Sequence, residues 1–538
     1  MVTINLDRDR LLRKLKVDEK ELEDLLFNLK SESKVIGDDI EIEVNADRPD
    51  LFSSDGIKRA IEGLKEISLG EPVYEVNPSD YVMKICNVKR RPYAIATIVK
   101  NVELDDKSLR ELIQFQEKLH GTIGRKRKKV AIGIHDLSKI KSKTIFYKEI
   151  PLNYKFIPLG EAHEEEVKKV LSSTLQGKEY GNLSTDWERG VIPSVIEENG
   201  KVMSIPPVIN SEHTRVTEKT SDLFIDVTGT SLDAVTQTIN IIASNLAEGG
   251  GKIYSVKLES NLNIKFMERR KIQVNTKNIV EVLGIRLSDK EIVHLLAKDR
   301  MDFELSSKTL RIPPYRVDIS RDEDVAEDVA MMYGYSRIEP TKLSVHERGS
   351  LETITLLERS LKDLCLGSGF IEVFTYVLTR KEYLTGEYVT IANPITEEYN
   401  AVRNSLIPVF MDFLSRNQSS RFPIRIFESA DVVVRDEESD TGYRNDKRLA
   451  LAIMDSKANY EDIQAPLHQV LLNLGFQPSY IRKESPYFIN GRSASIVIGN
   501  EEVGQLGEVS PELLDKFGIQ YPVVSAEISL SKIMKHFL

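Results

Sequence analysis

An acidic segment near residue 320 constrains the fold of this chain more than any other stretch. Between Asp318 and Asp328 it holds six carboxylates against a single base, Arg321. Asp324, Glu327 and Asp328 are spaced i, i+3 and i+4, so a helix would place their like charges on one face. The opposite stripe is apolar and consists of Val325, Val329 and Met332. The segment therefore predicts a helix that is anchored in a core and carries a charged face in need of compensation.

Three interpretations of this charged face follow from the residues. Asp318 lies on the extended stretch that Pro313 and Pro314 impose, so its carboxylate joins the helical acids at the mouth of the helix. Oxygen ligands of this kind suit Mg²⁺. We predict a Mg²⁺ site formed by four carboxylates, Asp318, Asp324, Glu327 and Asp328. A solvated acidic helix, and a bidentate pair between a carboxylate and the nearby Arg316, stay open beside it.

Composition describes an ordinary globular protein. A length of 538 residues suggests several domains, each with its own core. A net charge of −10 argues against nucleic-acid binding through bulk charge and leaves only local basic patches. Cys86 and Cys365 have no metal-ligand spacing, which predicts a reducing compartment and buried or inert thiols. No signal peptide or membrane-length apolar run is present. We therefore expect a cytoplasmic protein without a membrane partner.

The hydrophobic pattern divides the chain into four parts, residues 1–90, 91–265, 266–342 and 343–538. Frequent strand-to-strand successions predict an α+β, multidomain protein rather than a doubly wound one. The first two parts are mixed α and β. The last is expected to form an antiparallel sheet with flanking helices, and residues 389–394 are expected to be one of its strands.

Local signals predict individual helices. A long helix over Leu232–Ala247 should end at the glycines 249–251, which permit a left-handed C-cap. Ser288 and Glu291 should form a capping box at the start of another helix. In residues 266–342, two helices, a β-hairpin and the acidic helix suggest a winged-helix-like module. DNA phosphate would be repelled by that acidic helix, so we do not expect DNA as a partner.

Common catalytic signatures are missing, and two polar stretches attract attention instead. The sequence has no P-loop, no G-x-G-x-x-G, no H-E-x-x-H and no G-x-S-x-G elbow. A basic run from Arg125 to Lys129 either contacts a phosphate backbone or forms a solvated turn. A polar run follows two prolines, with the residues Asn210, Ser211, Glu212, His213, Thr214 and Arg215. It is either a small-molecule pocket able to orient a water or a polar surface loop.

Taken in order, several long stretches resemble the beta subunit family of phenylalanyl-tRNA synthetase in its shorter, archaeal and eukaryotic-cytosolic form. They cover the chain from end to end and include NADRPDLFSSDGIKRAIEGL, GRKRKKVAIGIHDLSKI, GVIPSVIEENGKVMSIPPVINSEHTRV, IPPYRVDISRDEDVAEDVAMMYGYSRI and IRIFESADVV. The resemblance implies an N-terminal domain (1–90), an editing domain (91–265), a winged-helix-like Mg²⁺-binding domain (266–342) and a class II synthetase-like module without catalysis (343–538).

The resemblance also implies site residues. The family motif D-x₅-D-x₂-E-D falls on Asp318, Asp324, Glu327 and Asp328, the same four carboxylates. The family's editing pocket, which hydrolyses tRNA mischarged with tyrosine, falls on Asn210, Ser211, His213 and Thr214. The expected function is the beta subunit of phenylalanine–tRNA ligase, which joins phenylalanine to tRNA(Phe) with ATP and Mg²⁺.

Adenylation is expected to lie elsewhere. The C-terminal stretch GQLGEVSPE resembles the glycine-rich motif 3 of class II synthetases but carries Glu508 where a cation must hold ATP, and a carboxylate repels a triphosphate. We therefore expect an alpha subunit to bind phenylalanine and ATP within an α₂β₂ heterotetramer, and this chain not to aminoacylate alone. A DNA-binding winged-helix regulator and a stand-alone Mg²⁺-dependent hydrolase remain the alternatives.

Overall fold

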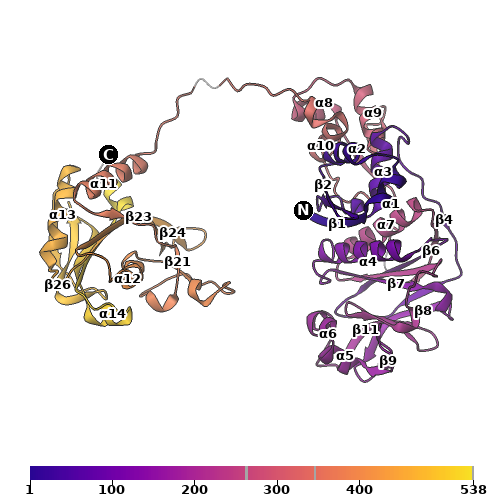
Figure 1. The fold of residues 1–538 in the computed structure, drawn as a ribbon, viewed down its shortest axis with the longest axis horizontal. Coiled ribbons are helices and arrows are strands. Elements are labelled where there is room, and N and C mark those ends of the chain that lie inside the picture. The colour runs from indigo at the N-terminus through magenta and orange to yellow at the C-terminus, as the bar shows by residue number, and fades with distance from the viewer. Residues whose placement is uncertain (261–263, 345–346, 536–538) are drawn as a thin grey trace. The chain divides into compact units, whose positions relative to one another are not determined.

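The computed structural model describes residues 1–260, 264–344 and 347–535. The chain forms two compact units, Met1–Lys342 and Leu343–Leu538, each described here by itself (Figure 1). Both contain helices and sheets, so the α+β, multidomain class expected from the sequence is confirmed. Among the described residues, no helix combines the length and the apolar character that crossing a membrane requires.

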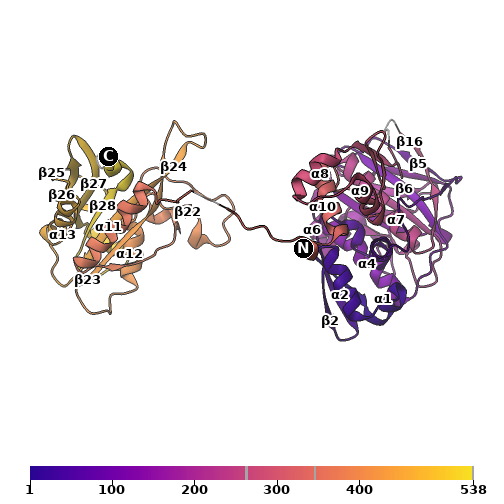
Figure 2. The same ribbon diagram turned by 90° about the horizontal axis from the view of Figure 1, so that it is seen from above.

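The N-terminal part of the first unit is a small antiparallel sheet of order β1-β3-β2 with three helices. Its elements are β1 (Val2–Asp7), α1 (Arg8–Leu15), α2 (Glu19–Asn28), β2 (Glu32–Ile36), β3 (Asp39–Val44) and α3 (Ser54–Leu64). Alternate residues of β3 are buried because one face of this sheet packs against the leucines of α1 and α2. Ser53 caps α3 through its hydroxyl, as the sequence indicates. Figure 2 shows these indigo elements close to α4 (Asp106–Gly121).

Two sheets packed face to face form the middle of the first unit, with strand orders β4-β15-β6-β14-β7 and β13-β12-β11-β8-β5-β16. Their strands are β4 (Val76–Asn77), β5 (Val82–Ile85), β6 (Tyr93–Lys100), β7 (Val130–Asp136), β8 (Thr144–Pro151), β11 (Val191–Glu197), β12 (Val202–Ile205), β13 (Ile209–Asn210), β14 (Leu223–Gly229), β15 (Lys252–Ser255) and β16 (Lys257–Glu259). The small pair β9 (Lys155–Phe156) and β10 (Glu165–Glu166) and the helices α5 (Val167–Ser173), α6 (Leu175–Tyr180) and α7 (Leu232–Glu248) complete this part.

Strand β14 is buried on both faces and shows how the layers are arranged. Its residues Leu223 and Ile225 face the core that α4 and α7 cover. Phe224 faces the second core, between the two sheets. Because side chains alternate along a strand, Asp226 is on the same face as Phe224 and points toward the second sheet. The sandwich therefore buries a carboxylate between its layers.

The remaining part of the first unit has the two helices, the β-hairpin and the acidic helix in the expected order, preceded by a strand, β17, that was not expected. It contains β17 (Arg270–Gln273), α8 (Thr276–Leu283), α9 (Asp289–Lys298), β18 (Asp302–Glu304), β19 (Thr309–Ile312) and α10 (Asp322–Tyr333). The strands form a sheet of order β17-β19-β18. Ser288 and Glu291 make the capping box of α9 that the sequence predicts. In Figure 1, α8, α9 and α10 lie at the opposite end of this unit from α5 and α6.

The second unit is built on a sheet of order β20-β23-β24-β28-β27-β26-β25, antiparallel except for the β20–β23 pair. Its elements are α11 (Thr353–Gly367), β20 (Ile371–Glu372), β21 (Leu378–Thr379), β22 (Ala401–Val402), α12 (Ile407–Ser415), β23 (Ile424–Arg435), β24 (Tyr443–Met454), α13 (Tyr460–Asn473), β25 (Pro478–Arg482), β26 (Phe488–Ile498), β27 (Glu501–Val509), α14 (Pro511–Lys516), β28 (Val523–Ser529) and α15 (Leu530–Met534). Helices α11, α13 and α15 pack on one face, and α12 and α14 pack on the other.

One strand predicted for the second unit does not form. Residues 389–394 form no strand, and only an isolated bridge pairs Thr390 with Ala401. The apolar residues of this stretch are too few to bury it, and its proline lacks the N–H that a ladder needs. The prediction for the thiols is half right, since Cys365 is buried but Cys86 is exposed. Burial raises the pKa of Cys365 to about 12.

Candidate functional site

The polar run after the two prolines lies at the edge of the sandwich, beside a cavity of about 260 Å³. Asn210 ends β13, and its side chain lines this cavity. Its amide nitrogen also makes a long hydrogen bond of 3.4 Å to the carbonyl of Ile134 on β7. Of the four residues predicted for an editing pocket, Asn210 is the one that contributes to the cavity wall.

Ser211 and His213 have other partners. The Ser211 hydroxyl donates to the carbonyl of Ile157 at 3.0 Å and caps the short 3₁₀ helix Glu212–Thr214. His213 turns to Glu197, with 2.7 Å between Nε2 and Oε1. The backbone N–H groups of two residues before β8 donate to the other oxygen of Glu197. In this structure these two side chains support the loop that carries Asn210 and do not line the cavity.

Thr214 belongs to a buried chain of hydrogen bonds that leads through His135 to Asp226 at the cavity. Its hydroxyl lies 2.8 Å from Nδ1 of His135, and Nε2 of the same imidazole lies 2.9 Å from Oδ1 of Asp226. All three residues are at most 1% exposed. Since a carboxylate only accepts, Nε2 carries the imidazole proton and Nδ1 accepts from the threonine. These two hydrogen bonds therefore fix the orientation of Asp226, which lines the cavity.

The opposite wall of the cavity comes from α4 and the turn that follows it. Glu117 Oε1 accepts from Arg127 Nη2 at 2.7 Å and lies 3.1 Å from Nδ1 of His120. The backbone N–H of Ile132 donates to Nε2 of His120, so His120 is neutral with its proton on Nδ1. Burial lowers the pKa of His120. Burial opposes ionisation of Glu117, yet the bonds from His120 and Arg127 hold the pKa of Glu117 below its ordinary value.

Two small residues leave room in this cavity. Ser204 on β12 is 3% exposed and lines the cavity, and its hydroxyl has no hydrogen-bond partner among the described residues. A Cβ added to Gly133 would lie 2.5 Å from Oδ1 of Asp226 and 2.7 Å from Nε2 of His135. Glycine is therefore the residue that lets the Asp226–His135 pair sit against β7.

The sequence analysis did not identify most of the polar residues around this cavity. It did not select Asp226, His135, Glu117 or His120, which stand alone within strand and helix patterns. A signal did exist in β14, where Asp226 follows three apolar residues and precedes a fourth. A carboxylate inside a strand that is buried on both faces needs a partner or a function.

The acidic segment has a different environment from the one expected for a metal. Arg316 is fully buried and holds Asp318 through a fork, Nε to Oδ1 at 3.0 Å and Nη2 to Oδ2 at 2.7 Å. The same Nη2 donates to both oxygens of Asp328, and Nη1 donates to Asp299. The bidentate pair that the sequence left open is therefore present.

These groups belong to a larger buried network that reaches the N-terminal part. Arg48 holds Asp50 at 2.9 Å and 3.0 Å, and Arg59 donates to the same carboxylate at 3.0 Å. Arg48 Nη1 lies 3.7 Å from Oδ1 of Asp299, which links the two halves. The network joins three guanidinium groups to four carboxylates, Asp50, Asp299, Asp318 and Asp328. Burial raises the pKa of Asp328 well above its ordinary value, which fits a surplus carboxylate that keeps its proton.

The other two predicted ligands point elsewhere. Oδ2 of Asp324 accepts from the backbone N–H groups of Ser320 and Arg321 at 2.7 Å and 3.0 Å, which caps α10. Glu327 is half exposed and pairs with Lys30 at 3.0 Å. Across residues 1–260, 264–344 and 347–535, no group of three or more His, Cys, Asp or Glu side chains is placed to hold a metal ion. In this arrangement the four carboxylates fit protein partners and do not fit a divalent cation, so Mg²⁺ at these residues stays a prediction of the sequence.

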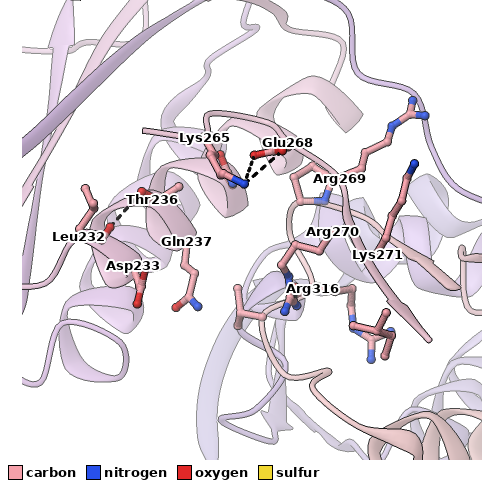
Figure 3. Close-up of a pocket in the computed structure, with 14 residues that line it drawn as sticks. Leu232, Asp233, Thr236, Gln237, Lys265, Glu268, Arg269, Arg270, Lys271 and Arg316 are labelled. Carbon is pink, nitrogen blue, oxygen red and sulfur yellow. Dashed lines mark hydrogen bonds and ion pairs between the residues drawn. The ribbon is translucent and has the colours of Figure 1, made fainter. Parts of the chain in front are cut away.

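A larger cavity of about 810 Å³ lies beside Arg316 (Figure 3). Asp233 and Gln237 of α7 are on one side of it, and Arg270 and Arg316 are on the other. Two of its cationic side chains have ionic partners. Lys265 pairs with Glu268 at 3.2 Å, and Arg269 pairs with Glu71 at 3.3 Å. Arg270 donates to the carbonyls of Ile319 and Arg316.

In the second unit, Glu508 has an ionic partner and a backbone partner. Glu508 Oε2 accepts from Arg492 Nη1 at 2.6 Å, and Oε1 accepts from the backbone N–H of Tyr460 at 3.2 Å.

Comparisons with known proteins agree with the whole-chain resemblance. Residues 272–335 match the family profile described as "tRNA synthetase B5 domain". Residues 338–530 match "Phenylalanyl tRNA synthetase beta chain CLM domain". The "Phenylalanine--tRNA ligase beta subunit" of Saccharolobus solfataricus is 52% identical over 545 residues, with 99% of each chain covered. The protein of the same description from Sulfurisphaera tokodaii is 50% identical over 538 residues, again with 99% of each chain covered.

A solved structure agrees for the first unit. The N-terminal fragment of the phenylalanyl-tRNA synthetase beta subunit from Pyrococcus horikoshii matches with 35% identity and a TM-score of 0.59. The match covers 62% of this chain and all of that fragment. The resemblance proposed from the sequence motifs is confirmed. With half of its residues identical to such relatives from end to end, this chain belongs to the family of phenylalanine–tRNA ligase beta subunits.

Proposed function

We propose that the 260 Å³ cavity is a hydrolytic editing pocket, in which this chain cleaves the ester of tyrosine mistakenly attached to tRNA(Phe). The observation that carries the proposal is a buried carboxylate, Asp226, which is oriented by His135 and Thr214 and lines the cavity. A carboxylate pinned at one oxygen, beside the amide of Asn210, can accept a proton and hold a water.

The chemistry is acyl transfer to water. The water oxygen forms a bond to the ester carbonyl carbon, the carbon–oxygen bond to the terminal ribose breaks, and the proton of the water passes to the ribose oxygen. Tyrosine and intact tRNA are released. In this proposal Asp226 accepts the hydrogen bond of the attacking water, and His135 is a positioning residue because it acts through Asp226.

An editing pocket must distinguish tyrosine from phenylalanine, which lacks only the phenol hydroxyl. The pocket therefore needs a hydrogen-bond partner for that hydroxyl. An apolar pocket rejects an extra hydroxyl only weakly, whereas a site that hydrogen-bonds it can discriminate strongly. Ser204 supplies a buried hydroxyl without a partner among the described residues, and a hydroxyl can both donate and accept. We therefore assign recognition of the tyrosine phenol to Ser204.

We further propose that an alpha subunit binds phenylalanine and ATP and carries out adenylation, and that an α₂β₂ assembly joins both activities with tRNA(Phe). Support comes from an exposed apolar surface on the second unit. Phe374 and Tyr376 are 79% and 76% exposed, and with Leu378 and Tyr399 they line one hollow. Aromatic side chains exposed together in this way are typical of a protein interface.

The test of the editing pocket uses the chain combined with its alpha partner. Asp226→Asn should slow hydrolysis of Tyr-tRNA(Phe) by about a hundredfold or more, because general-base assistance is worth that much. Asn210→Ala should also slow it. Glu188→Gln is the matched control, because Glu188 is an exposed acid that does not line the cavity. Equal rates in wild type and Asp226→Asn would contradict the proposal.

The test of the apolar surface is co-purification. The double variant Phe374→Ser and Tyr376→Ser should lose association with the alpha partner, while the chain itself stays folded because both side chains are exposed. Leu175→Ser, which removes an 81% exposed apolar residue from the first unit, is the control and should leave association unchanged. Retained association of the double variant would exclude this surface as the interface.

A further inference from the structure

The basic turn Arg125–Lys129 lies at the mouth of the proposed editing pocket, and neither the ligase activity nor the hydrolytic chemistry uses it. It connects α4 to β7, the two elements that supply one wall of the cavity. Arg127 itself lines the cavity. The turn is therefore fixed to the pocket by its central residue.

The backbone of this turn is unusual. Arg125, Lys126 and Arg127 have φ values of 47°, 53° and 62°, so three successive side-chain-bearing residues are left-handed. Each such residue costs about 1–2 kcal/mol relative to a right-handed one. Strain of this kind persists only where the surroundings impose it, and it concentrates at functional sites.

The Arg127 side chain anchors this turn to the cavity. Its Nη1 donates to the carbonyls of Pro207 and Val208 at 3.1 Å and 3.2 Å, and Nη2 donates to Glu117 at 2.7 Å. Its own carbonyl accepts from Arg91, a fully buried guanidinium, at 3.2 Å. The turn is thus tied to both walls of the cavity, and its shape does not depend on the neighbouring cations.

Those neighbouring cations have no ionic partner. Arg125, Lys126 and Lys128 are exposed, and within the part of the chain that the structure describes no carboxylate lies within ion-pair distance of them. Exposed lysines and arginines often pair with nearby acids in this chain, as Lys143 does with Asp80. A strained turn that presents three uncompensated cations is suited to a polyanion.

We propose that this turn is a phosphate clamp for the single-stranded 3′ end of the tRNA, and that it holds the terminal phosphates while the aminoacyl group is in the pocket. The inference rests on the proposed editing function. A cavity of about 260 Å³ is smaller than the pockets of about 300–1,000 Å³ that hold drug-sized ligands, so it accepts the aminoacyl ester and leaves the phosphates outside. The cations at its mouth are the groups placed to meet them.

The test compares two substrates in the complete complex of this chain with its alpha partner. One is Tyr-tRNA(Phe), and the other is 3′-O-tyrosyl-adenosine, which has the same ester but no phosphate. The triple variant Arg125→Gln, Lys126→Gln and Lys128→Gln should lower kcat/KM for Tyr-tRNA(Phe) about tenfold or more, with hydrolysis of the fragment unchanged. The slope of log kcat/KM against log salt should become shallower by about 2, since each single-strand contact contributes about 0.7.

A matched triple variant removes the same charge elsewhere in the domain. Lys201, Lys252 and Lys257 are exposed and do not line the cavity, so their replacement by Gln should leave both rates and the salt slope unchanged. Equal losses on both substrates would mean that the turn only supports the pocket, and an unchanged rate on Tyr-tRNA(Phe) would mean that it binds no phosphate. Either result overturns the clamp. Failure of the wild-type complex to hydrolyse both substrates would instead overturn the editing function, and the clamp with it.

Discussion

Arg316 holds Asp318 through two parallel hydrogen bonds, from Nε to Oδ1 at 3.0 Å and from Nη2 to Oδ2 at 2.7 Å. The two residues are separated by a single residue in the sequence, yet the pair forms part of a network that reaches Arg48 and Asp50 in the N-terminal part. The charge that the acidic segment needs therefore comes from within the protein. The Arg316 guanidinium contacts Asp318 and Asp328, two of the four carboxylates for which the sequence predicts a metal ion.

Removing this guanidinium should be costly. Arg316→Met leaves Asp299, Asp318 and Asp328 without their buried cation, and breaking a buried pair in this way costs about 3–5 kcal/mol. Urea unfolding of the full chain, followed by circular dichroism, should show this loss in the free energy of unfolding. Arg286→Met, at an exposed position, should change it by less than about 0.5 kcal/mol. Similar stability of the two variants would contradict the structural role of the network.

Magnesium should not stabilise the isolated chain through the acidic segment. Asp318 and Asp328 already accept hydrogen bonds from Arg316, and Asp324 already accepts from backbone N–H groups. Millimolar Mg²⁺ should therefore leave the Tm of the wild type unchanged, measured by scanning calorimetry without the alpha partner. A Mg²⁺-dependent rise in Tm that Asp324→Asn abolishes and the exposed control Glu323→Gln retains would instead establish the metal site.

A methyl group at Gly133 should disable hydrolysis without unfolding the protein. The added Cβ would lie 2.5 Å from Oδ1 of Asp226, so the carboxylate must move away from His135. A displacement of about 1 Å can cost about a hundredfold in rate. Deacylation of Tyr-tRNA(Phe) by the Gly133→Ala complex should fall accordingly. Gly121→Ala is the control, because no heavy atom lies within 4 Å of its added Cβ.

The neutral state of His120 should make stability depend on pH. Burial holds its folded pKa below the ordinary 6.5, so the unfolded chain binds this proton more readily. The contribution of neutral His120 to the free energy of unfolding is complete above pH 6.5. It is lost as the pH falls below 6.5, with a slope of up to about 1.4 kcal/mol per pH unit. Urea unfolding followed by Trp187 fluorescence, from about pH 7.5 to pH 5, measures this slope.

The slope should become shallower in His120→Gln and remain in the exposed control His163→Gln. The lowest pH of this series is above the ordinary pKa of a glutamate. Because the pKa of Glu117 is lower still, Glu117 stays ionised throughout the series. An identical slope in His120→Gln would mean that this imidazole is not the group that titrates.

The sequence by itself determined the features that depend on neighbours within one or two helical turns. Ser288 and Glu291 predicted their capping box, and the pattern that ends at glycines 249–251 predicted α7 to within one residue. These signals are local because a cap bonds N–H groups two or three residues away. The long, family-specific stretches also determined the family, since they are specific in order as well as in composition.

Only the tertiary structure decided which polar side chains meet. His135 is 79 residues from Thr214 and 91 residues from Asp226 along the chain. The antiparallel register of β7 and β14 brings His135 beside Asp226, and the loop after β13 brings Thr214 to the same imidazole. The partner of His213 was also decided by the tertiary structure. The resemblance places His213 in the editing pocket, whereas its imidazole faces Glu197 in the fold. A hydrogen bond needs positions fixed within a few tenths of an ångström, and sheet register across distant segments supplies that positioning.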